Sequence, residues 1–186
     1  EFRCLTHLTM VAFEGGHLDR LREHASTLLQ VGGEMGEADV PFARVLLAVA
    51  ELRSDPARAY RRLEDALRAL RDVSDKSHLA YGLNQAAVES LRLGRPAVAA
   101  GLAAEALAAA EAMNRSSERL IAGAILARCS AARGDRGAAR EAVMTLCATL
   151  AAGAGWSARA RAELATAAEA ANVGITTPAP TQTDVA

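Results

Sequence analysis

Apolar positions recur along this chain with the spacing of a helix, and the same arrangement returns four times. Each copy begins at a small turn residue, at Gly16, Ser54, Gly94 and Gly134, so the copies follow one another at intervals of 38, 40 and 40 residues. In every copy the fifth, ninth, twelfth and thirteenth residues after the turn are apolar, which places them on one face of a helix. They are Leu21, Ala25, Leu28 and Leu29, then Ala59, Leu63, Ala66 and Leu67, then Ala99, Ala103, Ala106 and Leu107, and finally Ala139, Val143, Leu146 and Cys147.

A second apolar helix is predicted before each turn, over residues 4–14, 42–53, 79–93 and 119–133. The repeating unit is therefore a helical hairpin with a period of about 38–40 residues. The four hairpins are expected over about residues 3–37, 42–75, 79–114 and 118–153.

The residues at the corners agree with this pattern. Asp55 can cap a helix that begins at Pro56, because proline at the first helical position gives up a hydrogen bond that would be unmade in any case. Gly94 and Gly134 permit the positive φ with which many helices end. The sequence therefore predicts an all-α chain.

A last helix is expected after the fourth hairpin. Ser157 can cap a helix that runs to about residue 172, with Trp156 packed at its start, and this helix would cover the exposed end of the stack. Residues 173–186 have no periodicity and contain prolines and threonines, so we expect a disordered tail or linker. Residues 1–172 are expected to form one helical-repeat domain.

The stretch LGRPAVAAGLAAEAL resembles the second half of a tetratricopeptide repeat. Ala99 stands at the small position of that motif, Ala103 at the position that is usually aromatic, and Ala106 and Leu107 at the closing pair. The period exceeds the family's value of about 34 residues, and the closing proline is missing. The resemblance implies a TPR-like right-handed superhelix of four hairpins plus a C-terminal capping helix.

Repeats of this length, rich in alanine and arginine, also look like those in the C-terminal sensor regions of MalT-like and LuxR-type bacterial signal-transduction ATPase regulators. That resemblance implies a non-catalytic binding or regulatory module of a larger transcriptional regulator, with its ATPase and DNA-binding modules outside this segment. A free-standing scaffold for a protein or peptide partner is the alternative. An enzyme with a site in the concave groove is a third reading, for which no catalytic motif was found.

Charge and cysteine spacing limit the partners further. The chain has 21 Lys and Arg against 22 Asp and Glu, so direct nucleic-acid binding by this segment is disfavoured. The longest uncharged stretch, residues 142–158, is too interrupted by glycine and polar residues to span a membrane. Cys4, Cys129 and Cys147 have no zinc-ligand spacing, so we expect buried, reduced thiols in a cytoplasmic protein and no metal or cofactor.

Small residues dominate the predicted core, because aromatic residues make up only 3% of the chain. Alanine lets helix backbones approach one another closely. We expect Gly82, Gly101 and Gly123 to lie where helix backbones cross, since a helical glycine otherwise costs about 1 kcal/mol relative to alanine.

The candidate binding site follows from the expected register of the first helix in each hairpin. Polar residues on the concave side of otherwise apolar helices include Arg44, Tyr81, Asn84, Gln85, Arg92 and Arg128. An aromatic hydroxyl, two amides and flanking arginines suit a small anionic or polyhydroxylated ligand, although a peptide remains open. The apolar residues Phe2, Leu5 and Leu8 suggest self-association through the N-terminal edge.

Overall fold

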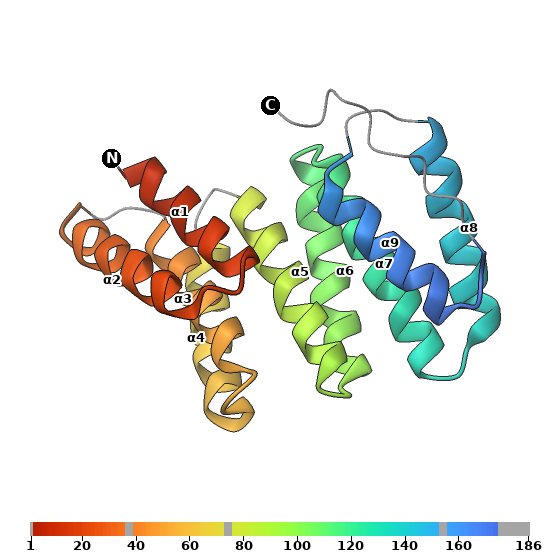
Figure 1. Ribbon diagram of the computed structural model, residues 1–186, viewed down its shortest axis with the longest axis horizontal. Coiled ribbons are helices and arrows are strands. Elements are labelled where there is room, and N and C mark those ends of the chain that lie inside the picture. The colour runs from red at the N-terminus through yellow and green to blue at the C-terminus, as the bar shows by residue number, and fades with distance from the viewer. Residues whose placement is uncertain (1, 36–38, 73–75, 153–155, 175–186) are drawn as a thin grey trace. The chain divides into compact units, whose positions relative to one another are not determined.

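The computed structural model describes residues 2–35, 39–72, 76–152 and 156–174, and these fold as nine α-helices without a strand (Figure 1). The all-α prediction is thus confirmed for this part of the chain. Three of the first helices of the hairpins begin three residues before their expected start, at Asp39, Lys76 and Ser116. The helices are α1 (Phe2–Glu14), α2 (Leu18–Met35), α3 (Asp39–Glu51), α4 (Pro56–Asp72), α5 (Lys76–Arg92), α6 (Pro96–Ala112), α7 (Ser116–Ala132), α8 (Arg136–Ala152) and α9 (Ala158–Ala170).

The corners between paired helices are formed as the turn residues predict. Gly94 and Gly134 have φ values of 70° and 86°, a conformation that costs glycine little. At the α3–α4 corner, Asp55 Oδ1 accepts a hydrogen bond from the backbone N–H of Arg58 at 3.2 Å, and Pro56 is the first residue of α4. Capping by Asp55 is therefore confirmed.

The chain divides into two compact units, residues 1–85 and residues 86–186, called unit 1 and unit 2 below. The division falls inside α5, where the sequence shows no break. A single repeat domain over residues 1–172 and a right-handed superhelix therefore stay predictions. The predicted tail lies outside the described residues from residue 175 onward.

In unit 1, α1 packs against α2 and α3, α2 packs against α3, and α3 packs against α4. The core is built around Phe42, which is fully buried at the start of α3. Its ring stacks on His78 with centroids 4.3 Å apart and meets Tyr81 edge-on at 5.8 Å. Aromatic pairs in these geometries add stability beyond the area they bury.

Unit 2 has a core of small and aliphatic side chains. Helix α7 packs against α6, α8 and α9, and α9 also contacts α8 (Figure 1). The buried residues of α9 are Ala160, Leu164, Ala167 and Ala168, which join the same apolar cluster as Ile121 and Ile125 of α7.

The start of α9 is held as the sequence predicts. Ser157 Oγ accepts a hydrogen bond from the backbone N–H of Ala160 at 3.2 Å, so its capping role is confirmed. Trp156 is half-buried against the cluster, and its Nε1 donates to the Leu150 carbonyl at 3.1 Å. An ion pair between Arg159 and Glu118 also joins α9 to the first turn of α7.

The three glycines expected at close helix crossings do not share one role. A Cβ on Gly82 would lie 2.9 Å from Val45 Cγ1, and one on Gly123 would lie 2.8 Å from Leu146 Cδ2, so both positions are tight. The space is taken by side chains, however, and not by a crossing backbone. At Gly101 a Cβ would meet nothing within 4 Å, so the expectation of a close crossing is wrong there.

The three thiols differ in exposure, which corrects the expectation that all are buried. Cys129 is buried and Cys147 is half-buried, whereas Cys4 is exposed on α1. Burial raises the pKa of the Cys129 thiol against the smaller opposing effect of Arg133 and Arg128, and burial also raises the pKa of Cys147. Both groups therefore hold less thiolate than an ordinary cysteine near neutral pH.

We predict that a thiol reagent applied to the native protein labels Cys4 in a fast phase and Cys129 only after unfolding. The thiolate is the nucleophile, and burial both covers Cys129 and raises its pKa, so its labelling in the native state should be slow. The measurement is a labelling time course with and without urea. Cys4→Ser is the control and should remove the fast phase alone; fast labelling of Cys129 in the native state would contradict the prediction.

Candidate functional site

Two of the predicted site residues lie in the core of unit 1. Tyr81 is 6% exposed and Asn84 is 1% exposed. The Tyr81 hydroxyl donates a hydrogen bond to Glu14 Oε1 at 2.8 Å, so its polar end is satisfied inside the protein. Asn84 also has an interaction partner, although no described residue donates to its Oδ1. These two residues support the fold of unit 1, while Gln85 is half-buried beside them on α5.

Two other predicted residues, Arg92 and Arg128, come together in unit 2. Both line an open hollow of about 440 Å³, which is within the range of small-molecule sites of about 300–1,000 Å³. The arginines extend from α5 and α7, the first helices of consecutive hairpins. The other lining residues are apolar and come from α5, α7 and α9: Val88, Leu91, Ala131, Ala132 and Ala170. We call this space the unit 2 hollow.

Each arginine of the unit 2 hollow is held by a carboxylate. Arg92 Nε donates to Glu89 Oε2 at 2.7 Å, one turn earlier on α5. Arg128 Nη1 donates to Glu163 Oε2 on α9, also at 2.7 Å. Glu89 is almost fully buried, and the side chains of Arg128 and Glu163 are each 19% exposed. These contacts fix the two guanidinium groups in position while leaving them further N–H donors.

The Arg92 guanidinium keeps hydrogen-bond donors for a ligand. Its contact with Glu89 uses the Nε–H group, and the described residues accept no bond from its two terminal nitrogens. Those nitrogens form the planar fork that matches a carboxylate or phosphate. The buried Glu89 thus directs the free edge of Arg92 and is a positioning residue for this site.

Arg44, the remaining predicted residue, lies in a different hollow, between α3 and α4 of unit 1. This space of about 310 Å³ is the unit 1 hollow. Its floor is apolar and its rim carries charges of both signs. The lining residues are Arg44, Leu47, Ala48, Glu51, Arg62, Asp65 and Ala66.

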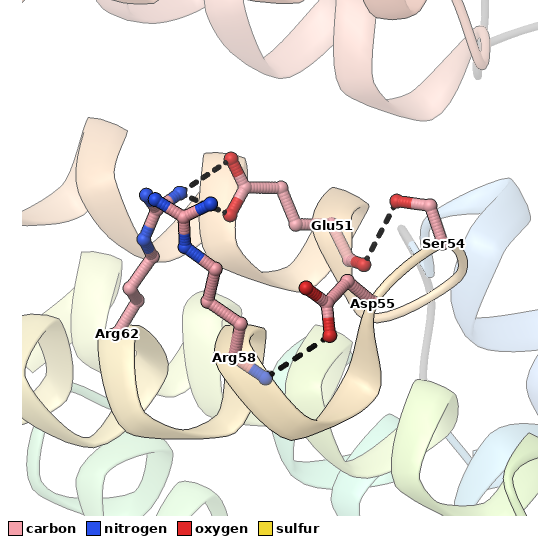
Figure 2. A network of polar contacts seen from close by, with 5 residues as sticks. All are labelled: Glu51, Ser54, Asp55, Arg58 and Arg62. Atoms are coloured by element: carbon pink, nitrogen blue, oxygen red, sulfur yellow. Dashed lines mark hydrogen bonds and ion pairs between the residues drawn. The ribbon is translucent and has the colours of Figure 1, made fainter.

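One wall of the unit 1 hollow is an ion pair between its two helices. Arg62 Nη1 donates to Glu51 Oε1 at 2.9 Å and to Oε2 at 2.7 Å (Figure 2). The Ser54 hydroxyl donates to the Glu51 backbone carbonyl at 3.2 Å, which fixes the end of α3 below that carboxylate. Arg58 also points toward Glu51 in Figure 2. Both oxygens of the Glu51 carboxylate therefore accept a hydrogen bond from Arg62, while the side chain stays 35% exposed.

The structure thus divides the predicted site residues between two units, and a single groove that combines them stays a prediction. Sequence reasoning missed Glu89, Glu163 and Asp65. Glu89 could have been found, since it stands three residues before Arg92 on the same helix. Glu163 could not have been found from the sequence. It lies 35 residues after Arg128 and reaches it only because α9 packs on α7.

Two apolar side chains of α1, near the N-terminal edge, are exposed. On α1 the side chains of Leu8 and Val11 are 46% and 64% exposed, whereas Leu5 packs against a buried cluster with Leu28. The side chain of Phe2 lies outside the described residues. Self-association at this edge stays a prediction.

Within the described part of the chain, no group of three or more His, Cys, Asp or Glu side chains is arranged to hold a metal ion. None of the described helices has the length and apolar character that crossing a membrane requires. Comparison of the chain with protein-family models, with curated proteins and with solved structures finds no match.

Proposed function

We propose that this chain is a non-catalytic binding module that holds a small organic anion in the unit 2 hollow. The observation that carries the proposal is that Arg92 and Arg128, from two helices, line one hollow whose other lining residues are apolar. The ligand that fits this arrangement has an acidic group at one end and an apolar body at the other. The sequence predicts a small anionic or polyhydroxylated ligand, and we take the anionic alternative.

The charges of the hollow favour an organic anion over an inorganic one. Arg92 and Arg128 are each balanced by a glutamate, so the four side chains sum to no net charge. A bare anion therefore gains little long-range attraction, and its gain comes from the direct hydrogen bonds to the guanidinium groups. Burial of an apolar body on Val88, Leu91 and Ala131 supplies the rest, at about 25 cal/mol per Å² of apolar surface removed from water.

A ligand in this hollow touches three helices at once, because the lining residues come from α5, α7 and α9. Binding to the folded form alone stabilises that form. We therefore propose that the ligand tightens the packing of α9 on α7. In a longer regulatory protein, which the resemblance to bacterial signal-transduction ATPase regulators implies, such tightening would serve as the sensory input.

The test compares 4-methylpentanoate with its neutral amide and with acetate, by calorimetry and by chemical-shift mapping on the full chain. We expect 4-methylpentanoate to bind, with shifts at residues of α5, α7 and α9. The amide lacks the charge and acetate lacks the apolar body, so both should bind at least tenfold more weakly, since about 1.4 kcal/mol corresponds to tenfold.

Arg92→Gln should weaken the binding of 4-methylpentanoate by about tenfold or more, because a hydrogen bond to a charged group contributes about 1.5–3 kcal/mol. Arg92 is the better target, since Arg128 also anchors α9 through Glu163. The matched control is Arg119→Gln on α7, an exposed arginine that does not line the hollow. Equal affinity of the wild type and the Arg92 variant would remove this site.

A further inference from the structure

We propose that the unit 1 hollow is a second binding site, and that it takes a zwitterion: a free amino acid with an apolar side chain. This inference is independent of the site in unit 2, because the two hollows share no residue and differ in charge arrangement. It rests on two opposite charges that line one hollow without meeting each other.

The positive charge is Arg44, one of the exposed residues of α3. It makes no hydrogen bond or ion pair with any residue that the structure describes. It lies one helical turn before Ala48, which forms part of the apolar floor. A guanidinium in this position can grip a carboxylate at one end of the hollow, and its side chain has no competing partner to give up.

The negative charge is Asp65 on α4, across the hollow. Arg68 Nη1 donates to its Oδ1 at 2.8 Å, which leaves Oδ2 without a donor among the described residues. This exposed i, i+3 pair is weakly held, because solvent screens it and both side chains are more than two-thirds exposed. Oδ2 can therefore accept a hydrogen bond from an ammonium group that enters the hollow.

Glu51 and Arg62 do not offer a competing pair of charges. Both carboxylate oxygens of Glu51 are occupied by Arg62, as Figure 2 shows. The charge of Glu51 is thus already balanced by Arg62, and each of its oxygens has one acceptor position fewer for an ammonium group, whereas Asp65 Oδ2 accepts no bond from a described residue. The Arg62–Glu51 ion pair instead joins α3 to α4 at the edge of the hollow.

The floor decides which zwitterion fits. Leu47, Ala48 and Ala66 line the hollow and have hydrocarbon side chains, and the two alanines are small enough to leave room for a ligand side chain. The volume of about 310 Å³ lies at the lower end of the range for small-molecule sites. An amino acid with an aliphatic side chain complements all three features of the hollow. Its carboxylate can bind Arg44, its ammonium group can bind Asp65, and its side chain can pack on the apolar floor.

The test uses three molecules that share one carbon skeleton: leucine, 4-methylpentanoate without the ammonium, and 3-methylbutylamine without the carboxylate. Each is titrated into the full chain while backbone chemical shifts of α3 and α4 are followed. We expect leucine to shift residues around Ala48 and Ala66, and each half-ligand to bind there at least tenfold more weakly. Binding of 4-methylpentanoate at this hollow with the affinity of leucine would overturn the zwitterion assignment, and no shift with leucine would overturn the site.

Two variants separate this site from the one in unit 2. Arg44→Gln and Asp65→Asn should each weaken leucine binding about tenfold and leave 4-methylpentanoate binding in unit 2 unchanged. Arg92→Gln should weaken 4-methylpentanoate binding in unit 2 and leave leucine binding in unit 1 unchanged. The matched controls are Arg61→Gln and Glu64→Gln, exposed residues of α4 that do not line the hollow. Unchanged leucine affinity in both Arg44→Gln and Asp65→Asn would sink the proposal even if the unit 2 site holds.

Discussion

Phe42→Ala is expected to lower the free energy of unfolding by about 3–5 kcal/mol, the cost of removing a large buried ring and leaving a cavity. Phe42 is fully buried and is the hub of the aromatic contacts with His78 and Tyr81. Tyr81 would lose its edge contact as well.

Urea denaturation followed by circular dichroism measures this loss. Phe42→Leu is the matched control: it keeps most of the apolar volume but loses both ring contacts, and should cost about 1–2 kcal/mol. If the alanine variant loses less than the leucine variant, the ring is not the centre of this core. Trp156 is the only tryptophan and lies in unit 2, so its fluorescence also shows whether unit 2 unfolds in the same transition.

Leu164→Ala is expected to cost about 2–5 kcal/mol and to loosen α9, because this fully buried leucine is the largest apolar side chain that α9 inserts beside α7 and α8. The remaining buried residues of α9 are alanines, which fill little of the space that leucine leaves. Ala170 of the same helix lines the unit 2 hollow, so the affinity for 4-methylpentanoate should fall with the stability.

Trp156 fluorescence during urea denaturation measures the first effect and calorimetry the second. Met144→Ala is the control, since this methionine of α8 is 54% exposed and its loss should change stability by no more than about 0.5 kcal/mol. A Leu164 variant as stable as the Met144 variant would show that α9 is not held by its apolar face. Leucine binding in unit 1 should be unaffected in either variant.

The candidate site residues have different environments in the folded chain. Arg44, Arg92 and Arg128 are polar positions on otherwise apolar helices, and all three line hollows. Tyr81 and Asn84 follow the same sequence pattern, yet both are buried. A polar residue on a helix face gives the same sequence pattern whether that face meets solvent or packs on a neighbouring helix. In the second case a residue of the neighbouring helix can supply the hydrogen-bond partner, as Glu14 does for the Tyr81 hydroxyl. Only the packing distinguishes the two cases.

The sequence by itself determined the all-α class, the order of the helices and the corners at Asp55, Gly94 and Gly134. These features depend on residues a few positions apart, through helical periodicity, capping and the positive φ that glycine allows. The tertiary structure alone decided that α9 lays Glu163 on Arg128, that Arg62 closes on Glu51, and that two separate hollows result. Such contacts depend on how closely helices that are distant in sequence approach each other. The pattern of residues within one helix does not determine that spacing.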